Sequence, residues 1–423
     1  MKLQKILNRF QKLHNREIDL SLDRIRFLMS KLGNPQDKIN CIQICGTNGK
    51  GSTISFLRSI LKEANYKCNI FTSPDVICIN ERFIYNDEMI SDDDLANLLN
   101  EVHEVNNGEP LTYFEALTAG FFLGCMKYQN NIVLAEFGLF GRGDAVNILK
   151  KNLANIAVSM SMDHESWLPE NDRTIERIIY EKTSSLLNSN IIVAKQSSNK
   201  ITECIKKNIS NNTANKIFYG EDYNYVLKEN DFFFYEDKYG SLRIPKPNIR
   251  GDFQIENAST AIATLRTLKD LNIKDQHIFE GIKKAYNPAR LEEIIEGNLK
   301  KLIKDNTLIC DGSHNPGGAE VLNKYLQSLN CDVHCIIGMM TNKNHKEYIS
   351  YFNKNIKSIT TIDIPNTPGA LDGKKLKEKF NAIPNVQYKK SIEESIKSLS
   401  LNKNDVVIIT GSLYLASEVF KIN

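Results

Sequence analysis

The chain has 423 residues, of which 41% are hydrophobic and 25% are charged. This composition is that of an ordinary globular protein and excludes a wholly disordered chain, while the length predicts two or three domains. The 54 basic and 51 acidic residues leave a formal net charge of +3. That charge is too small to indicate a binding surface for nucleic acid or for an anionic membrane.

The sequence predicts neither a membrane span nor a signal peptide. The longest uncharged apolar stretch runs from Ala116 to Met126 and is far shorter than the ~18–20 residues that a bilayer requires. The segment from Met1 to Lys5 has no continuous apolar core. The nine cysteines are odd in number and most lie in apolar runs, which favours buried thiols over a disulfide framework. We therefore expect a cytoplasmic protein.

Short apolar runs alternate with helical periods along most of the chain, which is typical of α/β proteins with mostly parallel sheets. Between Lys216 and Ile244 strand-like runs (217–219, 223–227 and 232–235) follow one another without helices, and this predicts a small antiparallel appendage. The helical pattern breaks at Pro288, and a new α/β series starts at Leu308. We expect one domain over residues 1–287 and a smaller, Rossmann-like α/β domain over residues 288–423. The expected strands of the two sheets are 39–45, 132–137, 156–160, 191–194, 308–310, 335–339 and 406–410.

A glycine-rich segment, Gly46-Thr47-Asn48-Gly49-Lys50-Gly51-Ser52, stands between the first of these runs and a helical period. In this context we expect backbone N–H groups to bind phosphates, Lys50 to lie beside the terminal ones and the Ser52 hydroxyl to bind Mg²⁺. The segment departs from the strict P-loop spelling because Ile44 replaces the first glycine and Gly51 precedes Ser52. The alternative is a glycine turn with a surface lysine.

Two later strands are followed by side chains of kinds that often bind ligands. Glu136 ends the run that starts at Ile132, and Asp163-His164 follows the run 156–160. Ligands of open α/β sheets bind at the carboxyl ends of the strands, and Mg²⁺ prefers oxygen ligands. The alternatives are a partly exposed strand-end glutamate and a structural histidine.

Lys182 lies on the apolar face of a predicted helix, four residues from Ile178 and from Leu186. Arg173, Arg177 and Glu181 are predicted to face outward. An inward lysine is costly unless it is paired, neutral or chemically modified. The alternative is a lysine that extends to solvent at the rim of the core.

The segment Asp311-Gly312-Ser313-His314-Asn315-Pro316 follows the strand 308–310. A strand-to-helix loop would present Asp311 and His314 at the start of the second α/β series. The same residues also suit a plain turn and helix cap.

Taken together, these segments resemble the folylpolyglutamate synthase/dihydrofolate synthase family of Mur-ligase-type ATP-dependent amide ligases. The match runs nearly end to end and keeps one order along the chain. The matching segments include Gly46–Ser52, Ser73-Pro74, Glu81-Arg82, Thr112–Glu115, Glu136–Gly138, Gly141-Arg142, Asp144, Asp163-His164, Glu181-Lys182, Asn257-Ala258, Arg290–Glu292, Asp311–Pro316 and Thr410–Ser412.

The resemblance implies that ATP phosphorylates a carboxylate of a pteroate or folate and that the amine of L-glutamate attacks the acyl phosphate. It implies that ATP is bound by Gly46, Thr47, Asn48, Gly49, Lys50, Gly51, Ser52, Asn257, Arg290 and Asp311. One or two Mg²⁺ ions would be held by Ser52, Ser73, Glu136, His164 and a carbamylated Lys182. The implied catalytic residues are Lys50, His164, Lys182, Asp311 and His314, and the implied pteridine-side residues are Arg82, Thr112, Phe114 and Asp144.

The chain departs from the family pattern mainly on the substrate side. Asp75 replaces the usual histidine, Phe140 and Gly143 alter the Leu-Gly-Gly-Arg-Leu-Asp segment, and Ala289 replaces the glycine of Pro-Gly-Arg. Asn342-Lys343-Asn344 replaces Asp-Lys-Asp. Whether the chain makes dihydrofolate, extends polyglutamate tails or does both stays open, and we expect both.

Three other functions are compatible with a glycine loop of this kind: a cell-wall Mur ligase, a degenerate nucleotide-binding protein and a generic P-loop NTPase. A cell-wall ligase needs a further domain before the loop, and 45 residues precede Gly46. A degenerate protein would have lost charged site residues that are present here. We expect a monomer that acts on small molecules, with an active site between the two domains that domain closure completes.

Overall fold

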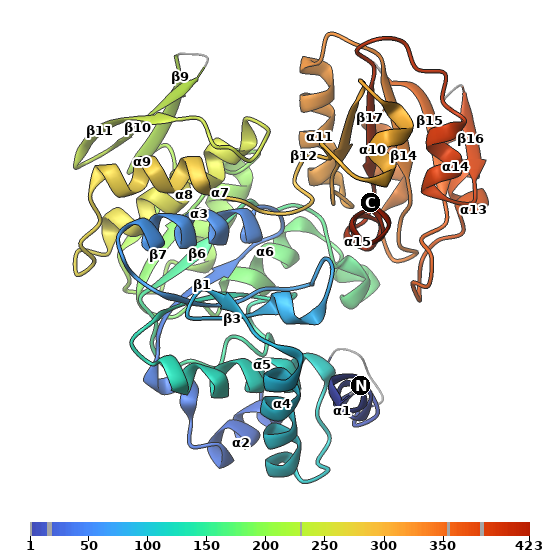
Figure 1. Ribbon diagram of the computed structural model, residues 1–423. Coiled ribbons are helices and arrows are strands. Elements are labelled where there is room, and N and C mark those ends of the chain that lie inside the picture. The colour runs from blue at the N-terminus through green and yellow to red at the C-terminus, as the bar shows by residue number, and fades with distance from the viewer. Residues whose placement is uncertain (1, 15–18, 229–230, 353–355, 381–384) are drawn as a thin grey trace. The chain divides into compact units, whose positions relative to one another are not determined.

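The computed structural model describes residues 2–14, 19–228, 231–352, 356–380 and 385–423. It divides into two compact units (Figure 1). Unit 1 comprises Met1–Met160, Ile175–Asn248 and Ile255–Tyr286, and unit 2 comprises Ser161–Thr174, Ile249–Gln254 and Asn287–Asn423. The predicted α/β class is confirmed. The predicted domains, residues 1–287 and 288–423, stay a prediction about which parts of the chain fold on their own.

An eight-stranded sheet forms the centre of unit 1, in the order β4-β3-β2-β5-β1-β6-β7-β8. From β2 to β8 neighbouring strands are parallel, and β3 and β4 add an antiparallel edge. In parallel sheets the carboxyl ends of the strands share one edge, where ligands bind. The strands are β1 (Asn40–Cys45), β2 (Cys68–Phe71), β3 (Phe83–Tyr85), β4 (Glu88–Met89), β5 (Ile132–Glu136), β6 (Ala154–Ala157), β7 (Asn190–Val193) and β8 (Lys216–Phe218).

Alternate residues of the central strands are buried on opposite faces of this sheet. Cys41 and Cys45 of β1 belong to an apolar core that includes residues of α1, α2, α4 and α5. Ile42 and Ile44 alternate with them, and α3 packs against α9 (Figure 1). The helices of this part of the chain are α1 (Lys2–Phe10), α2 (Asp23–Lys31), α3 (Lys50–Glu63), α4 (Asp92–Asn106), α5 (Tyr113–Gly124), α6 (Ile175–Thr183), α7 (Asn199–Asn208), α8 (Phe253–Thr267) and α9 (Asp275–Lys284). Short 3₁₀ helices span Pro35–Lys38, Ile79–Arg82, Cys125–Tyr128, Glu165–Trp167 and Glu170–Asp172.

The antiparallel appendage consists of β9 (Tyr223–Leu227), β10 (Phe232–Asp237) and β11 (Gly240–Pro245), in the order β11-β10-β9. The assignment of the first run, 217–219, to this appendage is wrong. Ile217 and Phe218 pair in parallel with Ile192 and Val193 of β7, so β8 is the edge strand of the large sheet. The helix α7 supplies the crossover that a parallel connection requires.

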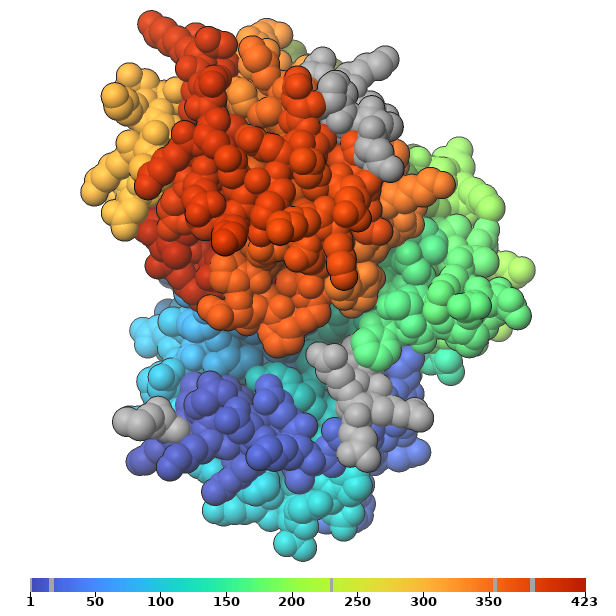
Figure 2. Space-filling model, turned by 90° about the vertical axis from the view of Figure 1, so that its right-hand side faces the viewer, coloured from blue at the N-terminus to red at the C-terminus, as the bar shows by residue number. Residues whose placement is uncertain are grey.

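Unit 2 contains a six-stranded sheet in the order β12-β13-β17-β14-β15-β16, which is parallel except for β12. Figure 2 shows one face of this unit in orange and red. Its strands are β12 (Glu292–Glu293), β13 (Thr307–Cys310), β14 (Val333–Ile337), β15 (Ile356–Ile362), β16 (Val386–Lys389) and β17 (Val406–Thr410). Its helices are α10 (Asn298–Ile303), α11 (Pro316–Ser328), α12 (His345–Ser350), α13 (Gly373–Glu378), α14 (Ile392–Lys397) and α15 (Leu413–Ile422).

For two strands the sequence predicts a start that is later in the chain than the start in the structure. The structure has β6 at Ala154–Ala157 and β14 at Val333–Ile337, where the sequence predicts 156–160 and 335–339. Val158 and Met339 are fully buried beyond the ends of these strands, so the apolar run continues past the last paired residue. In the described part of the chain, no helix is long and apolar enough to cross a membrane.

Candidate functional site

The glycine-rich loop joins β1 to α3 at the carboxyl edge of the large sheet. The chain turns at Gly46 (φ 135°) and at Gly49 (φ 97°), which directly precedes α3. A Cβ atom on Gly49 would lie 2.3 Å from Oδ1 of Asn257, so only glycine fits there. The N–H of Thr47 donates to the carbonyl of Ser159 (2.8 Å). The loop is thereby fixed at the N-terminus of a long helix, which is the geometry that binds phosphate.

Lys50 folds back over this loop. Its Nζ donates to the carbonyls of Gly46 (3.3 Å) and Thr47 (3.2 Å) and lies 3.7 Å from Oε1 of Glu136. Glu136 is buried at the end of β5. Its other carboxylate oxygen accepts the backbone N–H of Ser73 (3.3 Å). The structure therefore brings Lys50, Ser73 and Glu136 together.

These side chains provide oxygen donors for a cation. Oγ of Ser73 is buried and has no hydrogen-bond partner within the described residues, and the Ser52 hydroxyl is buried in the first turn of α3. Hydroxyl and carboxylate oxygens suit Mg²⁺, which usually completes its shell with water and substrate phosphates. Among the described residues no three His, Cys, Asp or Glu side chains gather as in a dedicated metal centre. The residues present thus fit an ion that is shared with a phosphate ligand.

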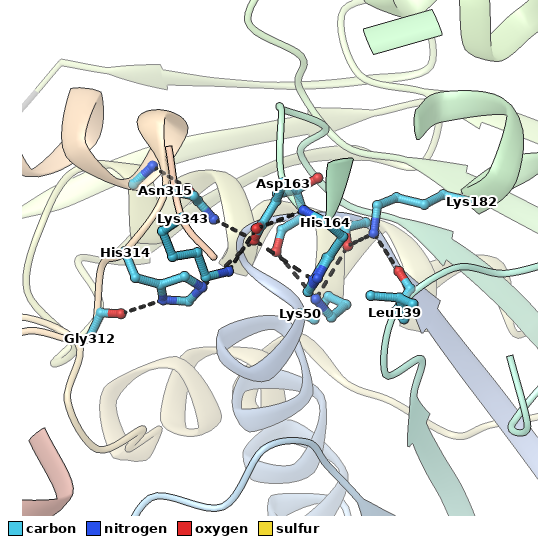
Figure 3. A network of polar contacts seen from close by, with 12 residues as sticks. Lys50, Leu139, Asp163, His164, Lys182, Gly312, His314, Asn315 and Lys343 are labelled. Carbon is cyan, nitrogen blue, oxygen red and sulfur yellow. Dashed lines mark hydrogen bonds and ion pairs between the residues drawn. The ribbon is translucent and has the colours of Figure 1, made fainter. Parts of the chain in front are cut away.

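Lys182 is buried, with 1% of its surface exposed, so the predicted inward orientation is confirmed. Its Nζ donates to the carbonyls of Leu139 (2.7 Å; Figure 3) and Gly46 (3.1 Å). The same nitrogen lies 5.5 Å from the centre of the Phe140 ring. Two carbonyls and an aromatic face stabilise a buried ammonium group. Lys182 therefore ties the glycine-rich loop to the loop that follows β5.

The prediction that Glu181 faces outward is wrong. Its carboxylate is buried and accepts two hydrogen bonds from the Arg142 guanidinium (2.8 and 2.9 Å). It also forms an ion pair with Arg177 (2.6 Å). A Cβ on Gly141 would lie 2.5 Å from the carbonyl of Lys182, so the loop and α6 are in direct contact. The helix ends at Thr183 and leaves Leu186, predicted to continue its apolar face, outside it.

Asp144 and Thr112, both predicted on the pteridine side, use their side chains to shape the backbone. Asp144 is buried and accepts the N–H groups of Leu139 (2.9 Å) and Val146 (3.0 Å). Burial raises the pKa of its carboxyl from 3.8 to about 6, although these hydrogen bonds oppose the rise. Thr112 caps α5 by accepting the N–H of Glu115 (3.2 Å).

Arg82 and Phe114, the other two residues predicted on that side, come together. The guanidinium of Arg82 lies 5.5 Å from the centre of the Phe114 ring and 5.7 Å from that of Phe71. Its Nε donates to the carbonyl of Thr72 (3.2 Å), and Nη1 lies 3.9 Å from the Asp75 carboxylate. A buried cation beside two aromatic rings has the chemistry to bind a flat, partly anionic ligand, and the role of Arg82 and Phe114 stays a prediction.

In unit 2 a network centres on Asp163 (Figure 3). Its carboxylate accepts hydrogen bonds from Lys343 (2.8 Å) and Asn315 (3.0 Å) and lies 3.7 Å from His314 Nε2 and 3.8 Å from His164 Nε2. Burial opposes ionisation of Asp163, but His164, His314 and Lys343 outweigh it and hold its pKa well below the usual range. The predicted site residues His164 and His314 are thus joined through a carboxylate.

The sequence analysis names Asp163 and Asn315 within matching segments but assigns no role to them or to Lys343. Lys343 is separated from Asp163 by 180 positions, so no local spacing connects them. The available signals were indirect: Asp163 precedes a candidate histidine, and Asn315 lies in the loop segment 311–316.

Arg290 and Asp311 also lie together in unit 2. Asp311 accepts the N–H groups of Leu291 (3.0 Å) and Ser313 (2.9 Å). Its carboxylate therefore connects the Arg290 turn to the loop after β13. The contacts described above connect several predicted site residues: the glycine loop with Asn257, Lys50, Glu136, Ser73 and Lys182; Arg82 with Phe114; His164 with His314; and Arg290 with Asp311.

Comparisons with known proteins identify relatives of this chain. Residues 290–413 match the model of the Mur ligase, glutamate ligase domain. The dihydrofolate synthase/folylpolyglutamate synthase of Bacillus subtilis is 29% identical over 424 residues, covering 95% of this chain and 94% of that protein. The Escherichia coli protein of the same name is 29% identical over 80% of this chain and 76% of its own length.

Solved structures give the same result. E. coli FolC in complex with DHPP and ADP superposes with a TM-score of 0.88 and 26% identity, covering 99% of this chain and 97% of that chain. A bifunctional folylpolyglutamate synthase/dihydrofolate synthase from Yersinia pestis, complexed with AMPPNP and Mn ion, has the same fold, with a TM-score of 0.86 and 22% identity over 99% and 97% of the two chains. The resemblance predicted from the sequence is confirmed.

Proposed function

We propose that the chain, a relative of the dihydrofolate synthase/folylpolyglutamate synthases, is an ATP-dependent ligase that joins L-glutamate to a pteroate or folate through an amide bond. The observation that carries the proposal is the phosphate-binding loop, with Lys50 beside the buried oxygen donors Glu136 and Ser73, in a chain that matches such a relative over 95% of its length. We propose that it acts on both dihydropteroate and reduced folates.

The reaction has two steps. A carboxylate oxygen of the acid attacks the γ-phosphorus of ATP, so that an acyl phosphate forms and ADP leaves. The amine nitrogen of glutamate then attacks the acyl carbon, phosphate leaves, and the nitrogen loses a proton. Such chemistry depends on alignment of the substrates and on neutralisation of phosphate charge, and it needs no covalent enzyme intermediate.

The glycine loop and the N-terminus of α3 would bind the ATP phosphates. Lys50 would exchange its hydrogen bonds to the Gly46 and Thr47 carbonyls for phosphate oxygens and neutralise charge at the γ-phosphoryl group. We propose that Asn257, Arg290 and Asp311 act on the same nucleotide, and that His314 acts near the reacting groups. Arg82 and Phe114 would contact the acid, while Thr112 and Asp144 would hold their loops through the backbone hydrogen bonds described above.

A bound Mg²⁺ would neutralise phosphate charge and polarise the transferred group. Ser52, Ser73 and Glu136 would hold it, and we propose His164 and a carbamylated Lys182 as further ligands. In the unmodified side chain Nζ of Lys182 donates to the carbonyls of Gly46 and Leu139; a carbamate would keep one N–H donor and give up the other hydrogen bond. Intact-mass and peptide mass spectrometry in bicarbonate buffer test this modification, and an unmodified Lys182 in the active, metal-loaded protein would remove it.

The test of function is incubation of the purified protein with ATP, Mg²⁺ and L-glutamate, with dihydropteroate or a reduced folate added in parallel. We expect glutamate-dependent ADP release with both acids and a product heavier by one glutamyl residue. Product from one acid alone would show that the enzyme has only one of the two activities. ADP release with neither acid would indicate another acceptor, such as a cell-wall precursor, and absence of nucleotide turnover would favour a binding protein.

The first substitution to test is Lys50→Ala. We expect ADP formation to fall by at least about 10³-fold, because charge on the γ-phosphoryl group is no longer neutralised. Lys62→Ala is the matched control, since Lys62 is an exposed lysine on the same helix and should leave turnover unchanged. Circular dichroism should show the same melting temperature for both variants. Near-normal turnover of Lys50→Ala would contradict the assignment of the loop.

Two further properties stay predictions from the sequence. We propose a cytoplasmic location and a monomeric state, the latter to be measured by analytical ultracentrifugation of the purified chain.

A further inference from the structure

Arg290 stands between two residues with left-handed backbone conformations. Ala289 has φ 55° and Leu291 has φ 48°, and both side chains are buried. Residues with a Cβ atom rarely adopt such angles, and they persist only where the surroundings hold them. In this chain Ala289 stands where the resembled family pattern has glycine. The turn that presents Arg290 therefore needs support from elsewhere.

Two carboxylates supply that support. The N–H of Ala289 donates to Oε2 of Glu292 (2.9 Å), and the N–H of Leu291 donates to Oδ2 of Asp311 (3.0 Å). The backbone N–H of each left-handed residue thus donates to a carboxylate, and such a hydrogen bond is stronger than one to a neutral acceptor. The carbonyl of Ala289 accepts the N–H of Gly312 (2.9 Å), so the turn is held on both sides.

The backbone of Glu292 is itself fixed. Glu292 pairs with Cys310 across β12 and β13, directly beside the Asp311 loop. The Arg290 side chain lies over the same loop: a Cβ on Gly312 would be 2.9 Å from Nη1 of Arg290, which donates to the carbonyl of Ala289 (3.0 Å). The conformation of the turn therefore determines where the guanidinium group lies.

We propose that Glu292 is a positioning residue, whose carboxylate holds Ala289 in the left-handed conformation and so presents Arg290 to the nucleotide. This inference rests on the proposed function, because it assumes that Arg290 acts on ATP. Glu292 touches neither the nucleotide nor the acid in this proposal. Its effect should therefore appear in nucleotide affinity and should depend on the residue at position 289.

The experiment measures ADP binding by isothermal titration calorimetry with Mg²⁺, together with the KM for ATP and kcat. Glu292→Ala should weaken ADP binding and raise the KM for ATP by about tenfold, since one charge-assisted hydrogen bond is lost. Glu292→Gln, which keeps an acceptor oxygen, should stay within about threefold of the native protein. Adding Ala289→Gly to Glu292→Ala should restore most of the affinity, because glycine adopts the left-handed conformation without support.

Glu293→Ala is the matched control, as Glu293 lies on the same strand and its side chain pairs with Arg250. It should leave ADP binding unchanged. An equal loss of affinity in Glu293→Ala, an unchanged affinity in Glu292→Ala, or a failure of Ala289→Gly to restore binding would each overturn the inference. If Glu292→Ala does not fold, the double variant Ala289→Gly/Glu292→Ala decides it: ADP affinity close to the native value supports the inference, and a loss of about tenfold overturns it.

The binding measurement separates this inference from the proposed function. If the native protein binds ADP but forms no product with any acid, the ligase assignment fails while the role of Glu292 is still read from the dissociation constants. If the native protein does not bind ADP, both are overturned.

Discussion

Asp144 lies in the loop that follows β5, and each of its carboxylate oxygens accepts a hydrogen bond from a backbone N–H group. Burial raises the pKa of this carboxyl in the folded protein from 3.8 to about 6. Between these two values the folded state binds more protons than the unfolded state. The free energy of unfolding that depends on Asp144 is therefore greatest below pH ~4 and decreases as the pH rises through ~6.

The variant Asp144→Asn removes this titration. We expect the difference in unfolding free energy between native protein and variant to shrink by about 2 kcal/mol from pH 4 to pH 7, as the shift in pKa requires. Urea unfolding at several pH values measures it. Asp93→Asn, at an exposed position of α4, is the control for the effect of an Asp-to-Asn exchange outside the core. A difference that grows with pH for Asp144→Asn would contradict the argument.

At the scale of elements, α6 is held by the loop that contains Arg142. Glu181 is buried and takes two hydrogen bonds from Arg142 and an ion pair from Arg177. The next residue, Lys182, is bound to the carbonyls of Leu139 and Gly46. The position of the lysine in the site thus depends on a salt bridge that lies outside the site.

Glu181→Gln should lower the free energy of unfolding by about 1 kcal/mol, because the buried carboxylate of Glu181 is lost as an acceptor for Arg142 and Arg177, whose own side chains are partly exposed. It should also lower kcat, since Lys182 loses the support of the preceding turn. Glu176→Gln on the same helix is the control: its side chain is about half exposed and pairs with Lys200, and the expected change is below ~0.5 kcal/mol. Equal effects of the two variants in urea unfolding would show that the salt bridge of Glu181 does not anchor α6.

For the whole molecule, the sequence predicts well what local patterns determine. The order of strand, glycine loop and helix can be predicted from apolar periodicity and glycine spacing. The inward orientation of Lys182 can be predicted from its position on the apolar face of a helix. What it misses depends on pairing over long separations. The edge position of β8, the buried Glu181 with its partner 39 positions away, and the contact of Lys343 with Asp163 at 180 positions all fall in this class. In each case the position of the residue or strand depends on a partner that lies outside the local sequence pattern.

The same limit applies to the segment Ser161–Thr174, which unit 2 includes although the chain on both sides of it belongs to unit 1. Asp163 connects this segment to the rest of unit 2, because its carboxylate accepts hydrogen bonds from Lys343 and Asn315. Phe253, from the second short segment, packs against the apolar core of unit 2. The stability of unit 2 therefore depends on residues that a boundary near residue 287 assigns to the other domain.

Asp163→Asn tests this dependence in the full chain by native-state hydrogen exchange, which reads the stability of each unit separately. Removing the charge leaves the largely buried Lys343 without its counter-ion, so amides of β14 and β17 should exchange about tenfold faster. Amides of β5, in unit 1, should keep their rates. Glu170→Gln, at an exposed position of the same segment, should change neither set. Faster exchange in β5 with unchanged β14 would mean that the segment stabilises unit 1 instead.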